Sequence, residues 1–197
     1  MKLVSEEIEG WWNSDGEKTI GGLMDVFDEK AFALLFVLLM AVPALPLPTG
    51  GATHVFEVIV ALLALQLLVG RRELWLPERF RARALDGPKQ EKFINGLLKF
   101  IRRMERFSKP RFRFLFGSRV SNAVYALIVI GLTAAAFVAP PFSGLDTLPA
   151  LGVVILSLGV LLEDVILAIV GVIVGVAGVL VAWIVGEAAF NFIKDLF

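Results

Sequence analysis

The chain has 197 residues, 57% of them hydrophobic, and its 19 basic and 19 acidic residues give a formal net charge of zero. This apolar fraction exceeds the roughly half-apolar composition of soluble globular domains, so the composition indicates a membrane protein. Cysteine is absent, which excludes disulfides, thiolate metal sites and cysteine nucleophiles.

The first segment, residues 1–30, is acidic and amphipathic, with eight acidic residues against three lysines. Apolar side chains recur at helical spacing from Ile20 to Phe27, which predicts a short helix leading into the first membrane segment. Because a cleaved signal peptide begins with basic residues, we expect no signal peptide here.

Residues 31–70 contain two apolar stretches, at about 31–47 and 52–69, which predict membrane helices. Prolines and glycines between the stretches prevent an uninterrupted helix. We therefore predict a first membrane hairpin whose turn includes Pro46, Pro48 and Gly50.

Residues 71–120 form a basic linker, since the window 70–120 holds 15 of the 19 Lys and Arg residues but only five of the 19 acidic residues. Loop Lys and Arg favour the cytoplasmic side, so we expect the linker to be cytoplasmic. Apolar side chains share one face between Lys89 and Phe107. This helix is expected either on the membrane surface, binding anionic lipid, or packed on its own protein.

The second membrane hairpin is predicted over residues 121–164, with apolar stretches at about 121–142 and 147–162 and a turn at Pro140, Pro141 and Gly144. Its layout of helix, Pro/Gly turn and helix repeats that of the first hairpin, which favours an internal pseudo-repeat. The alternative is no repeat, because any two membrane hairpins look similar at this level.

Each predicted hairpin ends in adjacent like charges, Arg71-Arg72 in the first and Glu163-Asp164 in the second. These charges either terminate the spans or form an ion pair between the two halves on the cytoplasmic side.

The last segment, residues 165–197, begins with an apolar stretch at about 165–186 that is long enough to cross a bilayer. Gly171, Gly175 and Gly178 form a small-residue stripe that permits close helix contact, within the chain or in a homodimer.

These elements predict an all-α, polytopic integral membrane protein with about five membrane helices. Two Pro/Gly-broken hairpins are joined by a basic cytoplasmic amphipathic helix and followed by a Gly-rich final span. A helix of about 16 residues spans about 24 Å, less than a hydrocarbon core of about 30 Å. The hairpins therefore either cross a thinned bilayer or enter it as re-entrant segments.

Two stretches of the chain carry a resemblance to a known family. Residues 22–32 read Gly-Leu-Met-Asp-Val-Phe-Asp-Glu-Lys-Ala-Phe and lead into the apolar run that ends Pro46-Leu47-Pro48. Residues 62–77 read Leu-Leu-Ala-Leu-Gln-Leu-Leu-Val-Gly-Arg-Arg-Glu-Leu-Trp-Leu-Pro. Both resemble the ExoD exopolysaccharide-synthesis membrane proteins.

The resemblance covers about residues 20–182. It implies a multi-pass protein of the bacterial inner membrane that is linked to exopolysaccharide production and to the polysaccharide-synthesis machinery. It supplies no catalytic residues. The chain departs from the family near Glu57, where a glycine or apolar residue is usual, and beside Asp164, where the family reads Arg-Asp-Gly.

The residue types do not indicate an enzyme. His54 is the only histidine, so a histidine-rich metal cluster or a Ser-His-Asp arrangement with a spare base cannot form. Glycine-rich phosphate loops are also absent from the sequence, and we expect no cofactor. The basic residues flank predicted spans, so we expect no nucleic-acid binding.

Polar groups inside a membrane are costly and are therefore candidate functional residues. Glu57 and Asp146 each lie near the start of the helix that follows a proline turn. The pseudo-repeat predicts that these carboxylates lie close together, with Thr53, Thr147 and Gln66 completing a substrate-binding set. The alternative for the two carboxylates is a helix-terminus role in interfacial water.

Two functions fit these patterns. The first is a small transporter or flippase-like component for a glycan, a lipid-linked intermediate or an ion, because broken-helix hairpins build the binding sites of known carriers. The second is a non-transporting scaffold or regulator of a polysaccharide-synthesis complex. A cavity at Glu57, Gln66 and Asp146 favours the first function, and a solid apolar interior favours the second.

Overall fold

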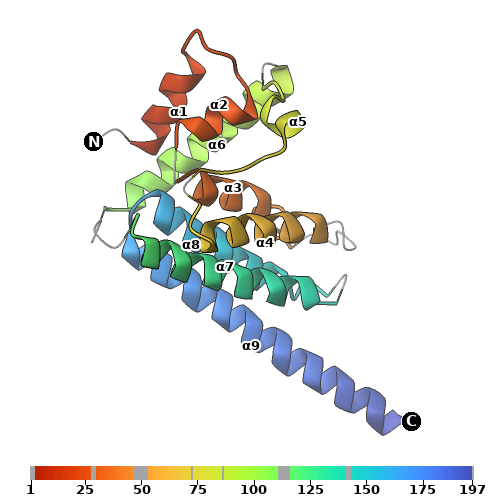
Figure 1. The fold of residues 1–197 in the computed structure, drawn as a ribbon. Coiled ribbons are helices and arrows are strands. Elements are labelled where there is room, and N and C mark those ends of the chain that lie inside the picture. Colours follow the sequence, from red (N-terminus) through yellow and green to blue (C-terminus); the bar gives the residue numbers. More distant parts are fainter. Residues whose placement is uncertain are drawn as a thin grey trace.

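The helices of the chain fall into a cap and a bundle, from which one long helix extends (Figure 1). The computed structural model describes residues 3–27, 30–46, 53–71, 73–85, 87–110, 116–140 and 143–196, with side chains up to residue 188. Within these ranges the chain is all-helical, with nine helices: α1 Val4–Trp12, α2 Ile20–Asp25, α3 Ala31–Met40, α4 His54–Leu68, α5 Glu78–Arg81, α6 Pro88–Phe107, α7 Arg119–Val138, α8 Thr147–Leu161 and α9 Val165–Leu196. Four residues singled out above lie outside the described ranges: Pro48, Gly50, Arg72 and Pro141.

The bundle consists of α3, α4, α7 and α8. Each helix contacts the next around a ring, α3 with α4, α4 with α7, α7 with α8, and α8 with α3. The first residue of α4 and the last turn of α7 meet at one end, where the ring centroids of His54 and Phe137 lie 4.9 Å apart. This end lies on the right in Figure 1. The helices beside the two predicted turns therefore share one end of the bundle.

The centre of the bundle is filled by α3 and α8, which are apolar on all faces, as expected of helices surrounded by protein. The ring of Phe36 in α3 lies 5.8 Å from that of Tyr125 in α7. The Tyr125 hydroxyl donates a hydrogen bond of 2.8 Å to Ser157 Oγ in α8. Three helices thus meet in a buried contact at the centre.

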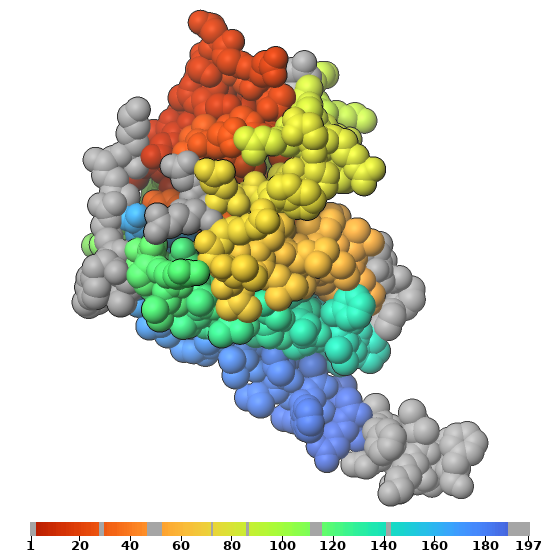
Figure 2. Space-filling view, viewed as in Figure 1, coloured from red at the N-terminus to blue at the C-terminus, as the bar shows by residue number. Residues whose placement is uncertain are grey.

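The cap brings together two segments that the sequence separates, residues 3–27 and 73–107. In it α1 contacts α6, and α2 contacts α5. A short antiparallel bridge joins Thr19 to Ala84. The cap lies over the bundle in Figure 1, and the space-filling view in Figure 2 shows the chain from about residue 70 to 85, in yellow, between the red N-terminal helices and α4.

Helix α6 corresponds to the amphipathic helix predicted from Lys89 to Phe107. Its apolar face is covered by the protein itself, since Ile94, Leu97, Leu98 and Ile101 are buried. Ser5 in α1 bonds Glu105 through both its backbone N–H and its hydroxyl, at 3.0 and 2.6 Å. Through these residues the helix packs on its own protein, as one of the two predicted placements requires, while Phe93, Phe100 and Phe107 stay exposed on its outer side.

Helix α9 packs against α8 along its glycines. A Cβ on Gly171 would lie 2.2 Å from the backbone nitrogen of Leu156, and a Cβ on Gly175 would lie 2.5 Å from Leu132 Cδ1 in α7. Gly178 is equally close to Leu148 and Pro149. The glycine stripe thus serves internal packing, and a homodimer through these glycines would have to replace these contacts.

Two helices in the described ranges are long and apolar enough to cross a membrane, Arg119–Val138 and Val165–Ala188. Only a minority of the residues in either helix is buried, and large apolar side chains lie on the surface of both, unlike the core helix of a soluble protein. The other three predicted membrane helices, α3, α4 and α8, are shorter apolar helices of 10, 15 and 15 residues. The prediction of about five membrane spans is therefore not confirmed, since only two helices of the described ranges have the length and apolar character to cross a membrane.

Local breaks explain why the remaining helices are short. The helix predicted from residue 31 to 47 ends at Met40, because Pro43 cannot donate a backbone hydrogen bond and restricts Val42 before it. Helix α8 ends in a turn in which Glu163 has a φ of 56° and Asp164 N–H bonds Gly159 C=O at 2.8 Å. Helix α9 begins directly after this left-handed turn.

Candidate functional site

Glu57 is the most unusual polar residue of the bundle. It lies in the first turn of α4, is 0% exposed, and has Oε2 2.7 Å from His54 Nδ1. Its Oε1 has no hydrogen-bond partner among the described residues. Burying a carboxylate with half of its acceptor capacity unused is costly, although the positive end of the α4 dipole offsets part of that cost. Packing alone does not account for a glutamate here.

Asp146 lies within electrostatic range of this carboxylate, and Thr53 and Thr147 lie at the same helix starts. Asp146 is near enough to act electrostatically on Glu57. It occupies the position before α8, yet its side chain makes no capping hydrogen bond, and the same holds for Thr53 before α4. Thr53 is buried, whereas Asp146 and Thr147 are half-buried. Four of the five predicted substrate-binding residues are thus at the starts of α4 and α8.

Gln66 is not part of this group, because it lies near the opposite end of α4. Its side-chain amide donates to Trp75 C=O at 3.2 Å, and its amide oxygen accepts from Trp75 N–H at 3.1 Å. Gln66 therefore fixes the chain that leaves α4. The prediction that Gln66 lies beside Glu57 is wrong, because about two and a half turns of helix separate the two residues.

His54 is a partner of Glu57 that residue types alone do not predict. The spacing of the two residues carries a signal, since residues three apart on a helix lie on the same face. In the described part of the chain, no three His, Cys, Asp or Glu side chains are placed to hold a metal ion.

The acidic pair at the other end of the bundle has two different roles. Lys30 Nζ lies 2.9 Å from Glu163 Oε1, which joins the start of α3 to the end of α8. Asp164 caps α9 by accepting hydrogen bonds from Ile166 and Leu167, and it also accepts from the Ser108 hydroxyl and Lys109 N–H. Burial by itself raises the pKa of Asp164, but these four hydrogen bonds outweigh it and lower the pKa below its usual range.

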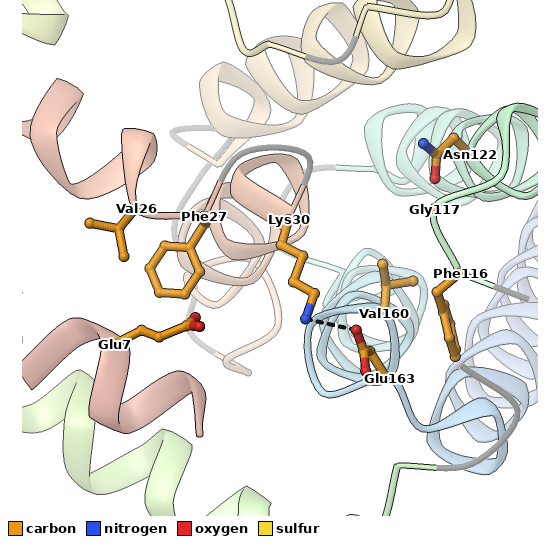
Figure 3. A pocket seen from close by; sticks show the side chains of 9 residues that line it. All are labelled: Glu7, Val26, Phe27, Lys30, Phe116, Gly117, Asn122, Val160 and Glu163. Carbon is orange, nitrogen blue, oxygen red and sulfur yellow. Dashed lines mark ion pairs between the residues drawn. The ribbon is translucent and has the colours of Figure 1, made fainter. Parts of the chain in front are cut away.

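A polar pocket of about 330 Å³ opens beside the Lys30–Glu163 pair (Figure 3). Its walls include Glu7 of α1, Phe27 between α2 and α3, Asn122 near the start of α7 and Val160 near the end of α8. A cavity of about 160 Å³ adjoins it and is lined by Arg71 and Arg119. Of the predicted charges, Glu163 lines the first of these cavities and Arg71 the second.

Comparison with known proteins identifies the family. The family profile described as "Exopolysaccharide synthesis, ExoD" matches residues 5–184. The chain belongs to the ExoD family. It is 27% identical to Protein ExoD of Rhizobium meliloti over 173 residues, which cover 87% of this chain and 72% of that protein. It is 28% identical over 167 residues to an uncharacterized protein of Synechocystis sp., covering 83% of this chain and 78% of that protein. No solved structure matches the chain significantly.

Membership of the ExoD family confirms the resemblance drawn from the sequence and links the chain to exopolysaccharide synthesis. The two long apolar helices fit a membrane location for such a protein. The Glu57 group and the pocket at Lys30 and Glu163 lie at opposite ends of the bundle, and both are candidate functional sites of this ExoD-family chain.

Proposed function

We propose that the chain is a multi-pass protein of the bacterial inner membrane that supports exopolysaccharide synthesis as a scaffold or regulator rather than by carrying a solute through its centre. The observation that carries this proposal is the filled centre of the bundle. Phe32, Leu34, Phe36 and Met40 of α3 are completely buried. Close packing of this kind leaves no continuous polar path along α3.

The cap offers the surface through which such a scaffold would act. Helix α6 buries Ile94, Leu97, Leu98 and Ile101 and exposes four basic side chains, those of Lys92, Lys99, Arg103 and Arg106. A basic face on a cytoplasmic cap would attract anionic lipid or acidic surfaces of the polysaccharide-synthesis machinery.

Transport of an ion or of a lipid-linked intermediate is the second candidate function. It is favoured by the buried Glu57 carboxylate beside His54 and Asp146, because ionisable groups inside a membrane mark ion and substrate pathways. Both functions place the basic segment 71–120 in the cytoplasm.

A complementation experiment separates the two functions. A strain lacking its ExoD-family gene would carry either the α6 variant, with Lys92, Lys99, Arg103 and Arg106 all replaced by Glu, or the variant Glu57→Gln with Asp146→Asn. We expect the α6 variant to lose exopolysaccharide and the carboxylate variant to retain it, at equal membrane levels of tagged protein. The reverse result would reject the scaffold and favour transport.

Reporter fusions test the membrane arrangement. Green fluorescent protein becomes fluorescent in the cytoplasm, whereas alkaline phosphatase becomes active outside it. A fusion near Gly87 should report the cytoplasm and a fusion after Phe197 the opposite side. A cytoplasmic C-terminus would mean that α9 does not cross the membrane, so that one of the predicted spans is lost.

A further inference from the structure

Helix α9 approaches α7 closely where Gly175 faces Leu132. Nearer the start of both helices, a groove of about 280 Å³ lies between them. Its walls are Val124 and Ile128 of α7 and Ile169 and Val172 of α9, and α8 forms its floor. Val124 and Ile169 are 50% and 53% exposed, so this apolar groove opens to the outside of the bundle.

The groove is continuous with the polar pocket at Lys30 and Glu163. Phe116, Asn122 and Val160 line both spaces. Asn122 also lines the adjoining cavity at Arg71 and Arg119, so it stands where all three spaces meet. Figure 3 shows Asn122, Phe116 and Val160 on the side of the pocket opposite Glu7 and Phe27. The apolar groove therefore adjoins the polar pocket.

The basic side chains around these cavities, Lys30, Arg71 and Arg119, differ in whether they form an ion pair. Lys30 is neutralised by Glu163. Neither Arg71 nor Arg119 has an ion pair or side-chain hydrogen bond with any residue in the described ranges. The guanidinium of Arg119 lies over Gly70, 3.1 Å from the place of a Cβ there, and this glycine leaves room for it. Two guanidinium groups and the Asn122 amide thus present unused donors to one cavity.

We propose that this site binds an anionic lipid, with its phosphate held by Arg71, Arg119 and Asn122 and one hydrocarbon chain in the groove between α7 and α9. Guanidinium groups bind phosphate through paired N–H donors. The apolar groove has no such donors and would hold only the hydrocarbon chain. A choline headgroup would bring a second positive charge to the two arginines, so a phosphate monoester lipid fits better. The proposal rests on the membrane location proposed above.

The test uses the absence of cysteine in the native chain. A single cysteine in place of Val124, labelled with bimane, reports lipid in the groove, and a second chain with bimane at Leu62 reports the exposed face of α4. Each full-length protein is placed in phosphatidylcholine nanodiscs that contain a minor fraction of dibrominated phosphatidic acid or dibrominated phosphatidylcholine. Bromine quenches bimane only on contact.

We expect brominated phosphatidic acid to quench bimane at residue 124 preferentially and both lipids to quench bimane at Leu62 equally. Arg71→Gln with Arg119→Gln should lower the preference about 30-fold, since each cation near a lipid surface contributes about fivefold. Arg79→Gln, a cationic site on the cap surface outside these cavities, should leave the preference unchanged.

Equal quenching by the two lipids at residue 124, or a preference that survives the double Arg variant, would overturn the proposal. Loss of the preference on adding inorganic phosphate would also overturn it, because the site would then serve free phosphate. Absence of quenching at Leu62 by either lipid would instead show that α4 does not face lipid. That outcome contradicts the proposed membrane arrangement and separates its failure from that of the lipid site.

Discussion

Arg81 Nη2 lies 2.6 Å from each carboxylate oxygen of Asp25, and this contact joins the acidic start of the chain to its basic middle. Glu9 and Arg102 form a second ion pair between the same two segments. The charges that the sequence separates into an acidic and a basic segment therefore meet within the cap, where they partly neutralise each other.

The first prediction concerns the strength of the Arg81–Asp25 pair. Both side chains are partly exposed, at 38% and 59%, so water and salt screen the interaction. A double-mutant cycle with Arg81→Ala and Asp25→Ala should give a coupling of about 0.2–1 kcal/mol in the free energy of unfolding, decreasing with added salt. A salt-independent coupling would mean that the pair is shielded from solvent.

The second prediction concerns the contact between α8 and α9. Gly171→Ala should destabilise the protein by about 1–3 kcal/mol, because the new Cβ meets backbone of α8 that cannot move aside independently. Gly186→Ala is the matched control, since no atom lies within 4 Å of its Cβ position. Thermal unfolding in detergent measures both variants. Equal midpoints would show that α9 does not pack on α8 through this glycine.

The third prediction concerns Asp164 and pH. Its pKa is lowered on folding, so the ionised carboxylate contributes stability above the pKa of the unfolded chain and loses it as the pH falls through the lower folded value. Asp164→Asn should cost about 1–2 kcal/mol at neutral pH, and the difference from wild type should shrink below about pH 4. Thermal midpoints measured across this range check it, and a difference independent of pH would contradict it.

The fourth prediction concerns the left-handed backbone of Glu163, whose φ is 56°. A side chain at such a position costs about 1 kcal/mol relative to glycine. With Lys30→Ala as the common background, Glu163→Gly should therefore be more stable than Glu163→Ala by about that amount. Unfolding in denaturant measures the difference. A more stable alanine variant would place residue 163 in an ordinary helical conformation.

Periodicity and turn residues were sufficient to predict the α-helical class, the amphipathic helix later seen as α6, and the role of Gly171 in close packing. Local patterns could not show that Ile94 and Ile101 of α6 would be covered by α1, because that contact joins segments about 90 residues apart in the chain. Each segment alone looked like a solvated or membrane-surface helix.

The candidate sites show the same division. Glu57 and Asp146 were grouped from the common layout of the two hairpins, and the structure places them within electrostatic range. Gln66 was grouped with them by polarity alone, and distance along α4 separates it. The Lys30–Glu163 pair was missed because lysine and glutamate at the ends of distant helices have no shared sequence pattern.

The cap is built from two separate segments of the chain, and this restricts how often the segment between them can cross a bilayer. Residues 3–27 and 73–107 form one body, so the segment between them crosses the membrane an even number of times, whether twice or not at all. Asp164 holds the end of α8 to Ser108 and Lys109, which imposes the same parity on the second hairpin. The last helix alone can then move the C-terminus to the other side. During synthesis, the cap can close only when residues 3–27 and 73–107 lie on the same side of the membrane.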